Sequence, residues 1–154
     1  MPVPKSVVKM NKNGIQYTSS VDKCQYFIHE LTRAALRDVG KFVSRKFREN
    51  FYSHFKKRTG KAGRATKYKV WASEKTTAPR VEIGLKTGQV DGFYAYFQEF
   101  GSSRTPRLGL LKKAAQENIE EIIKIESQYL SGLEDEAKAL TLISEQDYEG
   151  DGDE

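Results

Sequence analysis

The chain has 154 residues, of which 38% are hydrophobic and 11% aromatic, a composition that suits one compact domain with a real core. No apolar run reaches the roughly 18 to 20 residues that cross a bilayer, so we expect no membrane span and no membrane partner. The N-terminal residues lack the apolar segment of a secretory signal, and the single cysteine, Cys24, has no partner for an internal disulfide. These features predict a soluble protein made in the cytosol.

Charge is distributed unevenly along the chain, although its sum is only +5. Residues 133–154 contain nine acids and one lysine, a net charge of −8, whereas the preceding 132 residues hold 25 bases and 12 acids, a net charge of +13. Ten of those bases, with one acid, lie within residues 45–69. A basic body with an acidic tail predicts an anionic partner.

The first two expected elements are a hairpin and a long helix. Asn13 and Gly14 favour a tight turn between two short strands, so residues 1–20 are expected to form a hairpin or an extended arm. Between Cys24 and Phe55 apolar residues recur in steps of three and four, which predicts one amphipathic helix of about 30 residues.

Strands are expected after a basic loop at residues 56–66, which contains two glycines and no large apolar residue. Alternation over residues 68–72 and 80–85 predicts an antiparallel pair. The aromatic run that follows predicts a third strand, with Phe93, Ala95 and Phe97 facing the core.

Residues 107–130 are expected to form one helix with Ile119 and Ile122 on its inward stripe. The acidic residues 133–154 are expected to be mostly disordered, with a short helical turn near 137–143. The predicted fold class is therefore α+β: a long N-terminal amphipathic helix, a small antiparallel sheet of about three to four strands, a C-terminal helix and a disordered acidic tail. Residues 21–132 form its single domain.

Catalytic and metal-binding motifs are incomplete. His29 and Glu30 begin like a zinc-protease pattern, but Arg33 stands where the second histidine is required. The tail resembles the start of a calcium loop and ends before the closing glutamate. We expect no enzyme, no metal and no cofactor, and a nuclease that uses Glu82 or Glu99 with lysines stays as a minor alternative.

The segment of residues 94–102, Tyr-Ala-Tyr-Phe-Gln-Glu-Phe-Gly-Ser, is followed by a polar loop with Pro106 and by a Leu-Leu-Lys-Lys-Ala helix start. This pattern resembles the head–tail joining (tail-completion, neck) proteins of long-tailed bacteriophages and prophages. That family shows an aromatic-x-x-aromatic-x-Glu-aromatic-Gly-Thr/Ser stretch, a proline-bearing loop and a Leu-x-x-Ala helix start. Its Thr-Gly loop after a long first helix is matched by Thr59 and Gly60, so the resemblance covers roughly residues 21–125. Gly109 replaces a proline usual in the family, and Ala62 replaces a large apolar residue.

The resemblance implies a structural virion protein that completes the tail or neck and joins the tail to the DNA-filled head. Such proteins form a ring of identical subunits around the DNA channel, and the free protein is compatible with a monomer. The implied partners are other copies of the chain, neighbouring head-completion or connector proteins, tail proteins, and double-stranded DNA contacted non-specifically in the channel. The implied location is the virion neck, after assembly in the host cytoplasm.

Two groups of residues follow from this interpretation as candidate sites. Six cations of the basic loop are expected to face the DNA channel or a partner ring: Lys56, Lys57, Arg58, Lys61, Arg64 and Lys67. The motif residues are expected to shape the subunit contacts: Tyr94, Tyr96, Phe97, Glu99, Phe100, Gly101, Ser102 and Pro106. The alternative is a small, sequence-indifferent nucleic-acid-binding domain that uses residues 45–69 and carries its acidic tail as an internal mimic of the ligand.

Overall fold

The structure is a computed structural model that describes residues 3–55, 60–71, 78–86 and 90–149. Its central element is helix α1, Val21–His54, which at 34 residues is about 50 Å long. The predicted long helix is thus confirmed. Its buried stripe follows the expected spacing and consists of Phe27, Leu31, Ala34, Ala35, Val39, Gly40, Val43, Ser44 and Phe47.

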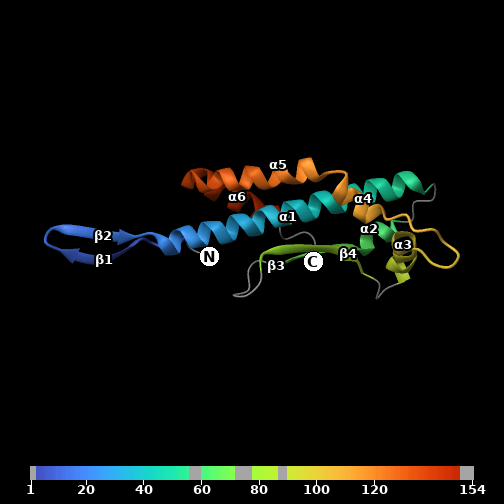
Figure 1. Cartoon of the computed structure of the whole chain (residues 1–154), viewed down its shortest axis with the longest axis horizontal. Helices are drawn as coiled ribbons and strands as arrows, with labels where there is room; N and C mark the ends of the chain where they lie inside the picture. Colours follow the sequence, from blue (N-terminus) through green and yellow to red (C-terminus); the bar gives the residue numbers. More distant parts are fainter. Residues whose placement is uncertain (1–2, 56–59, 72–77, 87–89, 150–154) are drawn as a thin grey trace.

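Two antiparallel strands, β1 (Val7–Lys12) and β2 (Ile15–Ser19), precede α1 and form a hairpin that extends beyond its end (Figure 1). Asn13 (φ 53°) and Gly14 (φ 78°) make the turn, because both residue types tolerate positive φ. The side chains of Ile15 and Tyr17 are exposed.

A second antiparallel pair, β3 (Thr66–Trp71) and β4 (Arg80–Leu85), packs on α1 and pairs Tyr68 with Ile83. The short helix α2 (Lys61–Ala65) leads into β3. Helix and sheet approach closely at Gly40, where an added Cβ would lie 2.7 Å from the Cδ2 atom of Tyr68. The predicted strand pair is confirmed, and within the described residues each sheet has two strands rather than three to four.

The predicted third strand is wrong, since Phe93 lies within helix α3 (Val90–Phe100). Aromatic residues favour strands, and the alternation of this run matched a strand with one buried face. The helix instead buries Ala95 and Glu99, which are four residues apart, and leaves Phe93 exposed. Gly101 ends α3 in the left-handed conformation (φ 81°), a common helix stop.

The predicted single C-terminal helix is two helices, α4 (Leu110–Gln116) and α5 (Ile119–Leu130). Between them the side-chain amide of Asn118 donates a hydrogen bond to the Ala114 carbonyl (2.9 Å), a local bond that competes with the helical pattern. The break shifts the phase of the stripe, so Ile119 is exposed and its predicted inward position is wrong.

The acidic tail is helical over much of its length, so the predicted disorder is not confirmed. A 3₁₀ turn (Ser131–Leu133) leads into α6 (Glu136–Glu149), whose Ala139 and Leu142 are buried against the N-terminal half of α1. An ion pair between Lys23 Nζ and a Glu136 carboxylate oxygen (2.6 Å) joins α1 to the start of α6. The last residues, 150–154, lie outside the described part of the chain.

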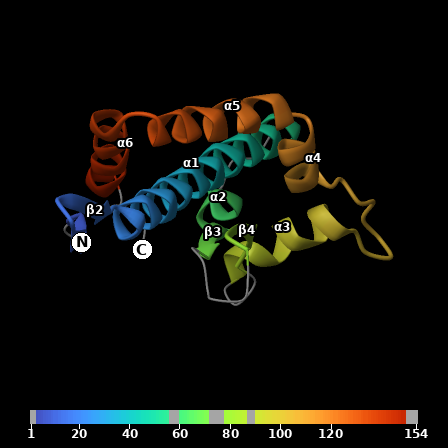
Figure 2. The ribbon, with the colours of Figure 1, turned by 60° about the vertical axis from the view of Figure 1, so that its left-hand side comes forward.

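The hydrophobic core lies in two parts along α1. Its N-terminal half packs against α5 and α6, and its C-terminal half packs against α4, β3 and β4. Figures 1 and 2 show α5 on one side of α1 and α3 on the other. None of the helices built from the described residues combines the length and the apolar character that crossing a bilayer requires.

Candidate assembly surface

The motif segment forms the end of α3 and a closed turn before α4. Within the turn, the Gly101 amide donates to the Phe97 carbonyl (2.8 Å) and the Leu108 amide donates to the Gln98 carbonyl (2.9 Å). Ser102 and Thr105 pair as an isolated bridge, and the Ser102 hydroxyl oxygen accepts from the Thr105 amide (3.1 Å). These bonds fix where the turn begins and ends.

Gly101 is required by two features of this turn. Its φ of 81° disfavours any side chain, and a Cβ there would lie 3.1 Å from the Arg107 amide nitrogen. The motif glycine therefore allows the backbone at Gly101 to pass close to the backbone of Arg107. Pro106 lies on the exposed outer part of the same turn.

Glu99 joins α3 to α4. Its side chain is only 5% exposed, and its two carboxylate oxygens accept hydrogen bonds from the backbone amides of Leu111 (2.9 Å) and Lys112 (3.2 Å). These amides belong to the first turn of α4, whose N-terminal N–H groups have no helical partner. A carboxylate satisfies them and interacts favourably with the helix dipole. The structure thus uses Glu99 as a cap between helices.

Sequence reasoning singled out Glu99 but missed its partners. Gly109, with φ 61°, stands at the N-cap of α4 and has no side chain with which to cap the helix. The signal was the glycine directly before the Leu-Leu-Lys-Lys helix start, because a helix that begins after glycine needs its cap from elsewhere.

The outer face of α3 is aromatic. Ring centroids of Phe93 and Phe97 lie 4.8 Å apart, and those of Tyr96 and Phe100 also lie 4.8 Å apart. Phe93, Tyr96 and Phe100 are exposed, and Phe97 is half-buried between them. We refer to Phe93, Tyr96, Phe97 and Phe100 as the α3 aromatic stripe. The exposed Tyr94 lies beside it.

The predicted basic loop, residues 56–66, is described only from residue 60, so Lys56, Lys57 and Arg58 lie outside the described residues. Residues 61–65 form helix α2, so the prediction of a loop is wrong there. Lys61, Arg64 and Lys67 are exposed on α2 and the start of β3. Helix α2 packs against α3, and Tyr52 of α1 anchors it by accepting a hydrogen bond from the Gly63 amide (3.1 Å) on its hydroxyl oxygen. The structure therefore places these cations beside the motif helix.

The aromatic ring of Trp71, on β3, is covered by cations. Lys69 Nζ lies 3.8 Å from the ring centroid and the guanidinium carbon of Arg80 lies 5.4 Å from it. Arg80 also donates to Glu82 Oε1 (3.0 Å), and this hydrogen bond lowers the pKa of the Glu82 carboxyl below its usual value. Trp71 thus belongs to a surface cluster of side chains rather than to an open stacking platform.

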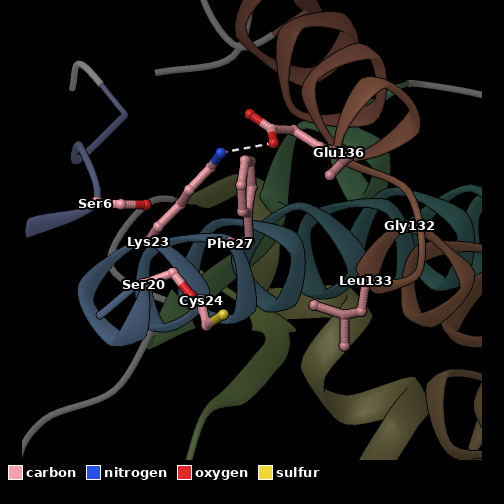
Figure 3. A pocket seen from close by; sticks show the side chains of 9 residues that line it. Ser6, Ser20, Lys23, Cys24, Phe27, Gly132, Leu133 and Glu136 are labelled. Carbon is pink, nitrogen blue, oxygen red and sulfur yellow. Dashed lines mark hydrogen bonds and ion pairs between the residues drawn. The ribbon is translucent and has the colours of Figure 1, made fainter. Parts of the chain in front are cut away.

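A pocket of about 270 Å³ lies at the N-terminal end of α1, near the Lys23–Glu136 ion pair (Figure 3). Cys24 and Phe27 line it with Ser20, Gly132 and Leu133. Within the part of the chain that the structure describes, no group of three histidine, cysteine or acidic side chains is placed to hold a metal ion.

Comparison of the chain with models of protein families, with curated proteins and with solved structures gave no match in any of the three.

Proposed function

We propose that this chain is a non-catalytic structural protein of a tailed phage or prophage, which completes the neck and joins the tail to the DNA-filled head. In this proposal its copies form a ring around the DNA channel. Neighbouring connector and tail proteins are its other partners.

The observation that carries the proposal is the use of Glu99. A resemblance between motifs gains physical support when each motif residue has a structural role that requires its residue type. Here a buried carboxylate caps α4, and a glycine with positive φ directly follows the aromatic residue after it. The aromatic residues of the same segment form a surface rather than a core. The motif residues therefore hold α3 against α4 and leave the aromatic face of α3 exposed.

The cations on α2 and β3, beside α3, support a location near DNA or near an acidic partner. Lys61, Arg64 and Lys67 are exposed on α2 and β3. Exposed cations can neutralise the phosphates of a DNA backbone without contacting the bases. The cations over Trp71 leave less of its ring for stacking on a base, which favours duplex contact over single-strand recognition.

The test is deletion of the gene from its phage or prophage, with electron microscopy of the lysate. We expect DNA-filled heads and finished tails that remain separate, and wild-type protein supplied in trans should restore joined virions. A Glu145→Ala variant, altered at an exposed position on α6, is the matched control and should restore them equally. Intact virions in the absence of the protein would end the proposal.

The nucleic-acid alternative is separated by titration of duplex DNA at several salt concentrations. Tight binding by the isolated chain that falls steeply with salt and is lost in a Lys61→Glu, Arg64→Glu, Lys67→Glu variant would favour it. Removal of residues 151–154 deletes three acids and should then strengthen binding. Removal of the whole tail is a poorer probe, because Ala139 and Leu142 are part of the core.

A further inference from the structure

A second exposed apolar surface lies on the other side of the molecule, between α1 and α5. It is a groove of about 210 Å³ whose floor includes Leu31, Ala35 and Tyr129. Its rim is apolar but open to solvent: Ile28 is 52% exposed, Leu130 64% and Leu133 47%. We refer to this feature as the α1–α5 groove.

The outer face of α5 extends the groove as a stripe. Ile119, Ile123 and Leu130 are all exposed, at positions i, i+4 and i+11, and Glu126 completes the spacing at i+7. Apolar side chains in alternating steps of four and three form the kind of seam that receives another helix. The inward face of the same helix already packs on α1 through Ile122, Ile125 and Tyr129. Helix α5 therefore has a covered apolar face and an outer face with three exposed apolar side chains, interrupted by Glu126, that is not covered within the described residues.

The α3 aromatic stripe has the matching pattern. Phe93, Phe97 and Phe100 stand at i, i+4 and i+7, which places them on one face of an 11-residue helix. A cavity of about 150 Å³ accepts a benzene ring, so a groove of 210 Å³ has room for one aromatic side chain. Both surfaces are thus built on helices, and the groove has room for one ring of the stripe.

The charges around the two surfaces are opposite. Residues 119–138, which form α5 and the start of α6, carry six acids and two lysines. Residues 60–71 and 90–113, which include α2, β3 and the whole of α3, carry eight cations and two acids, Asp91 and the buried Glu99. Complementary potentials of this kind orient an encounter and disfavour like-to-like pairing.

One molecule cannot bring the two surfaces together, because α3 and α5 lie on opposite sides of α1 (Figures 1 and 2). From these observations we propose that the α3 aromatic stripe of one copy docks into the α1–α5 groove of the next copy. The contact is heterologous, so it repeats around a closed ring or along an open chain. This inference rests on the ring assembly proposed above and assigns its subunit interface.

The test uses cysteine cross-linking in a Cys24→Ser background, because Cys24 is exposed and is the only cysteine. One variant carries Tyr94→Cys beside the stripe, one carries Ser127→Cys beside the groove, and one carries both, so that the docking side chains themselves are kept. A short bismaleimide reagent should join the two single variants to each other when mixed and join neither to itself. The double variant should give a ladder of dimers, trimers and larger products.

A control pair, Glu145→Cys with Ser127→Cys, keeps the cysteine beside the groove and moves the other to an exposed position on α6. It should give about tenfold less product. A second variant, Leu130→Ser, should weaken association about tenfold, because the leucine no longer contributes apolar burial.

Cross-linking is carried out both on the concentrated free protein and on particles assembled with the double variant. Self-linking of either single variant, or no specific product in any sample, would overturn the proposed pairing. The deletion assay tests the neck function separately. Separate heads and tails without any ladder would leave the function standing and reject the interface. A ladder from the free protein, together with intact virions in the deletion strain, would support the interface and reject the neck function.

Discussion

The removal of the Glu99 carboxylate tests whether α3 and α4 are held together as described. In a Glu99→Ala variant the amides of Leu111 and Lys112 lose their acceptor. A hydrogen bond to a charged group contributes about 1.5–3 kcal/mol, and loss of a helix cap costs about 0.5–2 kcal/mol. The first turn of α4 is partly open to water, and the variant no longer buries a charge. Because of these two effects we expect the loss of unfolding free energy to lie at the low end of the sum for the two hydrogen bonds, at about 3 kcal/mol.

For a chain of this size, a loss of about 3 kcal/mol lowers the melting temperature by roughly 6–12 °C. Urea unfolding followed by circular dichroism measures the same loss as a fall of about 1–2 M in the midpoint. A Glu99→Gln variant keeps one acceptor oxygen but directs an NH₂ group toward a backbone N–H, so we expect about half the loss. Glu145→Ala, at an exposed position, is the control and should stay within about 0.5 kcal/mol of the wild type. A midpoint for Glu99→Ala equal to that control would refute the capping role.

Three further predictions concern other parts of the structure. Gly40→Ala should lower the melting temperature, although alanine normally favours a helix, because its Cβ would lie 2.7 Å from the ring of Tyr68 and overpacking costs about 1–3 kcal/mol. Gly101→Ala should destabilise the chain through its φ of 81°, and a Gly101→Asn variant, with a residue that tolerates this φ, should lose less in the same melt. In an NMR titration the pKa of Glu82 should lie below its usual value of 4.5, and Arg80→Gln should raise it. The pKa of Glu82 is lower in the folded state than in the unfolded state. Its contribution to stability is therefore present above about pH 4.5 and disappears as the pH falls through the folded-state pKa.

Periodicity predicted the elements whose pattern had only one physical interpretation. The stripe from Phe27 to Phe47 repeats at helical spacing for more than five turns, and no strand or loop accommodates it. The alternation over β4 likewise matched its half-buried strand. Both elements follow from local sequence because the residues that alternate or repeat on one face are the less exposed ones.

The aromatic run was misread because its alternation fits a strand as well as a helix. Phe93, Ala95 and Phe97 alternate, but Ala95 and Glu99 also share a helical face. The deciding facts are the burial of Glu99 against the amides of α4 and the stop at Gly101, and the first of these is a tertiary contact. Only a short helical turn near residues 137–143 was predicted where α6 spans Glu136–Glu149, because the buried Ala139 and Leu142 are few apolar positions within an acidic segment.

The candidate site was predictable in its residues and not in its arrangement. The sequence indicated Glu99 and Gly101 through a family resemblance, but the role of the carboxylate depends on Leu111, twelve residues away. The exposed face of α5 was missed because the break at Asn118 changes the phase of the helix. Ile119 therefore faces the solvent, although the spacing from Leu111 and Ala115 predicted that it faces the core.

The position of α1 at the start of the core has a consequence for how the chain is made. The helix is synthesised before β3, β4, α4, α5 and α6, all of which pack against it. At about 5–20 residues per second, α6 follows the end of α1 by roughly 4–19 seconds. Until α6 is made, the N-terminal half of the α1 stripe lacks this partner, and contacts over such separations form slowly. The α1–α5 groove does not exist until Leu133 has been synthesised, whereas α3 ends at Phe100, so a nascent chain can present its α3 stripe before it can receive one.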